Sequence, residues 1–166
     1  MEILDGKKLS NEIIEELKVR CDELKEKGIK PKFAVIMVGN DKASQIYVKN
    51  KRKACEKVGI ECVECFLDED IQQKELIDKI KELNSDNTIH GILLQSPIPK
   101  HLDINEAFET ISPKKDVDGF NPTNVGKLCL NQDTFVSCTP FGIIKLLDKY
   151  DIDLTGKKVT IIGRSN

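Results

Sequence analysis

The sequence has little of three things: histidine, net charge and long apolar runs. Its formal net charge is −2 over 166 residues, so no strong electrostatic field attracts nucleic acid or an anionic membrane surface. The first residues, MEILDGKKLSNEIIEELKV, lack the apolar core of a signal peptide, and no run is long enough to span a bilayer. We therefore expect a cytoplasmic protein that binds neither nucleic acid nor membrane.

The scarcity of histidine also limits metal chemistry. Only two histidines are present, and neither lies near the CxxC pair Cys62 and Cys65, so a four-ligand zinc site lacks half of its ligands. Both cysteines fall in a predicted strand, where their odd spacing points them to opposite faces. We interpret the six cysteines as reduced structural thiols and predict no metal.

What is present is an alternation of apolar strands and amphipathic helices. This order predicts an α/β domain with a parallel sheet and right-handed crossovers. The expected elements, in chain order, are a helix at 7–27, a strand at 33–38, a helix within 38–59, a strand at 60–67, a helix at 71–83 with Leu76, Ile77, Ile80 and Leu83 inward, a strand at 89–95, a helix at 103–111, a helix at 139–150 and a strand at 158–162.

Two segments beyond residue 111 depart from this regular alternation. Residues 112–128 are turn-rich with little periodicity, which indicates a functional or interdomain segment, and Thr139-Pro140 is a typical N-cap and first-turn pair. The strand at 158–162 ends in Gly163, which either opens a dinucleotide-binding unit or makes an ordinary turn. Because a lone terminal strand has no neighbours, we expect a truncated chain.

One helix face carries the strongest chemical signal. Ser44, Tyr47 and Lys51 lie three and four residues apart, just past a strand end, where open α/β sheets hold their active sites. A run of lysines is usually a solvated helix face. However, Ala54 and Val58 continue the stripe and turn it toward protein, and a desolvated lysine can act as a base or proton relay.

Further polar candidates follow the third predicted strand. Gln95 closes that strand at the same sheet edge, where its amide can hold an amine without adding charge. Asp116 and Asp118 stand two apart in a glycine-ended turn, KDVDG. They could bind a metal, although the other ligands of a calcium loop are missing, or accept N–H groups of a nitrogen heterocycle, or form only an Asx turn. The sequence leaves these three interpretations open.

Five ordered motifs, VGNDKASQIYVKNKRKAC, NTIHGILLQSPIP, KDVDGFNPTNVGKL, CTPFG and IIGRSN, resemble the bifunctional methylenetetrahydrofolate dehydrogenase/methenyltetrahydrofolate cyclohydrolase family. The resemblance runs from LDGKKLS to the last residue. It implies a three-layer α/β parallel-sheet catalytic domain over 1–119 that binds folate. Residues 120–166 would then be a linker, a connecting helix and the first strand of a truncated Rossmann-like NADP-binding domain.

The same resemblance implies the reaction and the roles of the residues. The enzyme oxidises 5,10-methylenetetrahydrofolate with NADP and hydrolyses the methenyl product to 10-formyltetrahydrofolate, in one-carbon metabolism, as a homodimer. Lys51 matches the lysine that helps to activate water, and Gln95 matches the amide that tunes it. Tyr47 matches the aromatic residue that packs against the folate, Asp118 the carboxylate that holds the pterin ring, and Ser44 a serine near the lysine.

For the cofactor, the resemblance implies contacts from Gly163, Arg164 and Ser165. Two residues depart from the family pattern: Ser96 stands where leucine is usual, and Ser137 stands where a proline usually precedes the next cysteine. The first affects the pterin pocket and the second only the linker. Two alternatives to the enzyme stay open, namely a folate-binding module without turnover and an unrelated doubly wound domain with a surface lysine.

Overall fold

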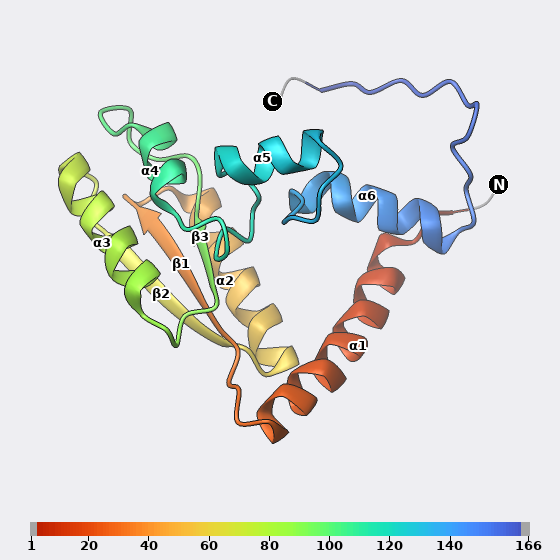
Figure 1. Ribbon diagram of the computed structural model, residues 1–166, viewed down its shortest axis with the longest axis horizontal. Coiled ribbons are helices and arrows are strands. Elements are labelled where there is room, and N and C mark those ends of the chain that lie inside the picture. Colours follow the sequence, from red (N-terminus) through yellow and green to blue (C-terminus); the bar gives the residue numbers. More distant parts are fainter. Residues whose placement is uncertain (1–2, 164–166) are drawn as a thin grey trace.

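A parallel three-stranded sheet with the strand order β2-β1-β3 lies at the centre of the computed structural model, which describes residues 3–163 (Figure 1). The strands are β1 (Lys32–Val38), β2 (Glu61–Leu67) and β3 (Gly91–Leu94). The helices are α1 (Gly6–Glu26), α2 (Lys42–Val58), α3 (Gln73–Ser85), α4 (Ile104–Thr110), α5 (Pro122–Cys129) and α6 (Cys138–Lys149). Both strand pairs are parallel, which confirms the predicted sheet.

Helices cover both faces of the sheet and make three layers (Figure 1). On one face, Ile36 of β1 packs with Leu76 of α3 and Ala107 of α4. On the other face, Val35 of β1 packs with Val48 of α2. The central strand is therefore buried on both sides, as its continuous apolar run predicts.

Two finer predictions about packing are also confirmed. Cys65 contacts the cluster on the α3 side and Cys62 contacts the cluster on the α2 side, so the two thiols point to opposite faces of β2. The inward face predicted for α3 is buried in full, at Leu76, Ile77, Ile80 and Leu83. All six cysteines are free thiols.

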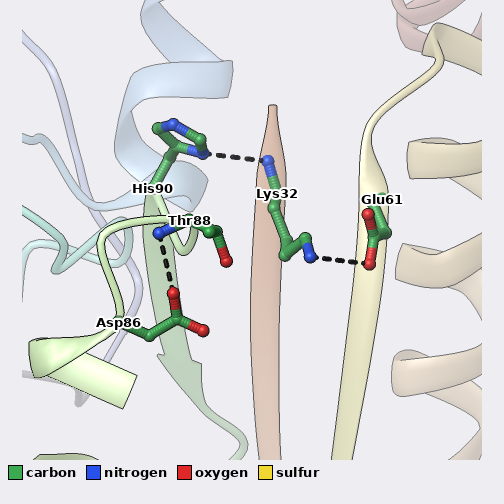
Figure 2. A network of polar contacts seen from close by, with 5 residues as sticks. All are labelled: Lys32, Glu61, Asp86, Thr88 and His90. Atoms are coloured by element: carbon green, nitrogen blue, oxygen red, sulfur yellow. Dashed lines mark hydrogen bonds and ion pairs between the residues drawn. The ribbon is translucent and has the colours of Figure 1, made fainter. Parts of the chain in front are cut away.

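The amino-terminal edge of the sheet is closed by polar contacts among neighbouring strands (Figure 2). The backbone N–H of Lys32 donates to Nδ1 of His90 over 3.1 Å, and Lys32 Nζ pairs with the Glu61 carboxylate at 2.9 Å. In the turn before His90, the Asp86 carboxylate accepts from the backbone N–H of Thr88 at 2.7 Å. These side chains therefore have structural partners at the edge where no active site is expected.

The predictions for the two last helices need correction. Residues 112–128 are not irregular throughout, because α5 begins at Pro122 with Asn121 as its N-cap, whose side chain accepts from Thr123 N–H at 2.8 Å. Helix α6 does not begin at Thr139-Pro140. Its N-cap is Ser137, so Pro140 lies in the first turn, where its missing N–H costs no hydrogen bond.

The strand predicted at 158–162 is wrong in this structure. Residues 157–163 form no strand, and none of the described residues pairs with them. Every one of them is exposed, and Ile162 is exposed in full. A strand needs a neighbour for its backbone N–H and C=O groups, and the described residues offer none here. No helix within residues 3–163 has the length and apolar composition to cross a membrane.

Candidate active site

The start of α2 lies directly after β1, at the carboxyl-terminal edge of the sheet. Asp41 caps the helix, since its side chain accepts from the backbone N–H of Ser44 at 2.7 Å, and this hydrogen bond lowers the pKa of Asp41. The cap places Ser44 in the first turn, where it is only 2% exposed. The helix then presents Lys51 two turns further along, toward β3.

Lys51 and Gln95 meet across the gap between α2 and the end of β3. Lys51 Nζ donates to Gln95 Oε1 over 2.9 Å. Gln95 is itself fixed, because its backbone N–H donates to Ile36 O at 2.8 Å and its Nε2 donates to Ser96 O at 2.7 Å. The Lys51 ammonium also lies 5.6 Å from the centre of the Tyr47 ring, within the range of a cation–π contact.

A cavity of about 230 Å³ joins these groups to the segment that follows α4. Its lining residues come from α2, the end of β3, the KDVDG turn and the first turn of α6. They are Lys51, Leu93, Leu94, Gln95, Ser96, Asp118, Phe120, Ser137, Cys138 and Thr139. The structure thus brings together Lys51, Gln95 and Asp118, although Lys51 and Asp118 are 67 residues apart in the sequence.

The charges in this cavity influence one another. Burial raises the pKa of the Asp118 carboxyl, the nearby Lys51 lowers it, and the Asp116 charge raises it again. Burial also raises the pKa of the Cys138 thiol, which Asp118 raises further and Lys51 lowers. The cavity therefore holds a cation, a carboxylate of raised pKa and a protonated thiol within mutual electrostatic reach.

Two predicted residues lie outside the cavity lining. Ser44 is buried beneath the helix start, and Tyr47 is 61% exposed, although its ring stays within reach of Lys51. The helix face that Lys51 shares with Ala54 and Val58 is also less buried than expected, because Val58 is buried whereas Ala54 is exposed. Residues four apart drift around a helix by a few tens of degrees, so one stripe can begin in the core and end in water.

Asp116 and Asp118 have different surroundings in the fold. Asp116 is 2% exposed and does not line the cavity, and its carboxylate accepts from the backbone N–H of Gly119 at 3.1 Å, three residues further on rather than the two of an Asx turn. Asp118 alone reaches the cavity. Within residues 3–163 no three acidic, thiol or imidazole side chains gather as a metal site would require.

Among the polar residues of the cavity, Cys138 and Thr139 were not predicted from the sequence, and Ser137, which was expected to affect only the linker, lines the cavity as well. Cys138 was interpreted as a structural thiol, yet it lines the cavity beside Asp118. The signal was its place in the CTPFG motif, at the first residue of α6. Gly163, an expected cofactor contact, is exposed, and a Cβ atom added there would meet no other atom within 4 Å. Arg164 and Ser165, the other expected cofactor contacts, lie outside the described residues.

A larger hollow, of about 600 Å³, lies between α2 and β2 and contains none of the predicted site residues. Its wall mixes the cations Lys49 and Arg52 with the carboxylates Glu64, Asp68 and Glu69. Arg52 is occupied by Glu56 and Glu64, at 3.4 and 3.5 Å. Convergence of polar groups, rather than volume, therefore makes the smaller cavity the candidate site.

Comparison with known protein families finds two models that match this chain. Residues 4–118 match the family described as tetrahydrofolate dehydrogenase/cyclohydrolase, catalytic domain. This chain belongs to that family. Residues 137–166 match the NAD(P)-binding domain of the same family, so the chain holds an α/β catalytic domain followed by the start of an NAD(P)-binding domain.

Relatives in the family are longer than this chain. It is 52% identical to the bifunctional protein FolD of Nautilia profundicola, over 100% of this chain and 58% of the relative. The crystal structure of the FolD methylenetetrahydrofolate dehydrogenase/cyclohydrolase of Campylobacter jejuni has a TM-score of 0.92 and 51% identity, over 93% of this chain and 55% of that one. A FolD structure from Trypanosoma brucei, complexed with NADP and inhibitor, has a TM-score of 0.89 and 31% identity, over 93% and 54%.

Proposed function

We propose that this chain carries the folate-binding and hydrolytic half of a methylenetetrahydrofolate dehydrogenase and methenyltetrahydrofolate cyclohydrolase. The observation that carries the proposal is the pairing of Lys51 Nζ with Gln95 Oε1 at 2.9 Å, in the wall of a cavity that also holds Asp118. The family supports it, as does the similarity to the FolD enzymes.

Hydrolysis of the methenyl group needs a water molecule that loses a proton while it attacks a cationic carbon. The bond from oxygen to the methenyl carbon forms, and the bond from that carbon to one ring nitrogen breaks with its electron pair left on the nitrogen. Of the two protons of the water, one ends on that nitrogen and the other is released. Lys51 accepts the released proton at Nζ when it is in its neutral amine form, and Gln95 Oε1 holds the amine by accepting a hydrogen bond from one of its N–H groups. The neutral amide adds no charge that would oppose the change in protonation.

Asp118 and Tyr47 bind the rest of the substrate. The Asp118 carboxylate accepts hydrogen bonds from the N–H groups of the pterin ring, and its negative charge offsets the repulsion between Lys51 and a cationic substrate. Tyr47 is exposed beside Lys51, so its ring face is available to pack against the folate. Ser44 supports this arrangement from below, as the first-turn residue that Asp41 caps.

The redox half is proposed for the whole protein, with NADP as its cofactor. The NADP complex of the Trypanosoma brucei relative supports the choice of NADP. The described part of the NAD(P)-binding match, residues 137–163, forms α6 and an exposed segment without a strand, and it does not make a dinucleotide cradle. The division at residues 119 and 120, the homodimer and the cytoplasmic location stay predictions.

The decisive experiment replaces Lys51. Lys51→Met keeps the length of the side chain and removes the amine, so we expect it to abolish methenyltetrahydrofolate hydrolysis while folate binding stays measurable. The matched control is Lys49→Met, an exposed lysine on the same helix that lies outside the cavity. Both variants are measured in this chain and in a chimera continued with the remainder of the Campylobacter jejuni relative, with the absorbance of the methenyl group as the readout.

The outcomes separate the enzyme from a binding module without turnover. Hydrolysis lost in Lys51→Met and kept in Lys49→Met supports the proposal, and unchanged hydrolysis in Lys51→Met overturns the role of Lys51. Folate binding with no hydrolysis in the unsubstituted chain and chimera favours the binding module instead. The exposed segment 157–163 predicts no NADP binding by this chain alone, and NADP reduction with methylenetetrahydrofolate only in the chimera.

A further inference from the structure

The KDVDG segment is anchored at nearly every residue except the one that reaches the cavity. Lys115 Nζ donates to the backbone carbonyls of Leu83, Asn84 and Asp86 at 3.1, 2.8 and 2.7 Å, and so holds the end of α3. The backbone carbonyl of Lys115 accepts from Ile92 N–H at 2.7 Å, which ties the segment to β3. The segment thus starts from a rigid support on the sheet.

Asp116 sits in a cage of N–H donors. Its carboxylate accepts from the backbone N–H groups of Gly119 and Asn121, at 3.1 and 2.8 Å, and from Asn124 Nδ2 at 2.8 Å. Asn124 Oδ1 in turn accepts from Thr134 Oγ1 at 2.9 Å. A carboxylate has about four acceptor positions and an amide oxygen two, so three converging donors can be satisfied by aspartate and not by asparagine.

The residues on either side of Asp118 are held as firmly. Val117 packs into the cluster on the α2 side of the sheet. Gly119 has φ of +71°, and a Cβ there would meet Phe135 O at 2.8 Å, so only glycine fits. The backbone of Asp118 is therefore fixed at both ends, and its side chain is the one charged group of the Asp116–Gly119 turn that enters the cavity.

We propose that Asp116 is a positioning residue for Asp118. By gathering the N–H groups of Gly119, Asn121 and Asn124, its buried carboxylate holds the turn in the shape that directs the Asp118 carboxylate into the cavity beside Lys51. This inference rests on the proposed function only for the ligand, since the cage and the direction of Asp118 are properties of this chain.

The buried charge of Asp116 has a second effect on its neighbour. The groups that face Asp118 are Lys51 from α2, Cys138 from α6 and Asp116 from its own turn. Burial and the Asp116 charge raise the pKa of Asp118, whereas Lys51 lowers it. Loss of the Asp116 charge removes one cause of the raised pKa. This change moves the pKa of Asp118 down.

The test is a cycle of Asp116→Asn, Asp118→Asn and the double variant in this chain. Affinity for 5-formyltetrahydrofolate is measured by calorimetry, and the pKa of the Asp118 carboxyl by carbon-detected NMR titration. We expect Asp116→Asn to weaken binding by roughly tenfold in the parent background and by less than about twofold when Asp118 is already Asn. We also expect the pKa of Asp118 to fall in Asp116→Asn.

Each outcome has a definite meaning. Equal losses of affinity in both backgrounds mean that Asp116 only supports the fold, and they overturn the proposal, as does an unchanged pKa of Asp118. If the parent chain binds no 5-formyltetrahydrofolate, the proposed function fails, while the pKa measurement still decides the role of Asp116. If Asp116→Asn does not fold, Thr134→Val perturbs the same cage at a half-buried site, and the same non-additivity with Asp118→Asn is required.

A control variant separates positioning from general loss of stability. Ile80→Val removes one methylene from the core on the opposite face of the sheet, at a residue with no exposed surface. We expect it to lower the stability of the chain and to leave both the folate affinity and the pKa of Asp118 unchanged. An equal weakening of folate binding in Ile80→Val would assign the Asp116 effect to stability alone.

Discussion

Helices α3 and α6 are amphipathic and nearly equal in length, at 13 and 12 residues, yet only α3 is buried. α3 places four apolar side chains in the core between itself and the sheet. α6 has no buried residue, and Phe141, Ile143 and Ile144 are all exposed. An apolar stripe on a helix is therefore buried only where a second surface packs against it.

The largest expected effect tests this contrast directly. Leu76→Ala in α3 leaves a cavity in the core and should lower the free energy of unfolding by about 2–5 kcal/mol. Ile144→Ala in α6 removes exposed apolar surface and should change it by less than about 0.5 kcal/mol. Urea unfolding of this chain measures both, and equal losses would mean that α6 is buried in solution.

A smaller effect is expected where the two regions meet, at Asp118. The folded state raises the pKa of this carboxyl, so folded protein binds a proton at a pH at which the unfolded chain has released it. Its contribution therefore lowers stability as pH rises from the usual aspartate value through the raised one. Asp118→Asn removes this dependence, so the variant should gain stability relative to the parent as the pH rises above the usual aspartate pKa of about 4. Urea midpoints across this range measure the difference, and a relative loss in the variant would contradict the raised pKa.

The smallest effect is expected at the opposite edge of the sheet. Glu61 pairs with Lys32 at 2.9 Å, but its side chain is 55% exposed (Figure 2). Glu61→Gln should cost no more than about 1 kcal/mol, and the loss should shrink as salt is added. Thermal unfolding at low and high salt checks this, and a large loss that salt does not change would show a structural role instead.

Local signals predicted most of the fold. The continuous apolar run of β1, the inward stripe of α3 and the short helix α4 within the predicted range 103–111 all appear as expected. The cap of α5 was overlooked, although Asn121-Pro122 carries the same type of signal that was assigned to Thr139-Pro140. The strand at 158–162 was wrong for a different reason, since a strand depends on a neighbour that local sequence does not describe.

Sequence patterns likewise predicted only part of the candidate site. Helical spacing placed Tyr47 near Lys51, and strand order placed Gln95 at the same edge of the sheet. Spacing could not show that Ser44 is buried, that Cys138 lines the cavity, or that Asp116 and Asp118 have different surroundings. These properties depend on contacts between segments that are distant along the chain, such as Asn124 with Asp116 and α6 with Asp118.

The sequence by itself determined the alternation of helices and strands, the parallel sheet and the edge at which Lys51 and Gln95 meet, because these follow from periodicity and from the direction of parallel strands. Periodicity and spacing left open which aspartate of KDVDG reaches the cavity; the family resemblance pointed to Asp118, and only the tertiary structure gives the physical reason. The two carboxylates are chemically identical, and their roles differ because of their surroundings. The fold directs the N–H groups of Gly119, Asn121 and Asn124 to Asp116, so that Asp116 is held in the turn and Asp118 faces the cavity.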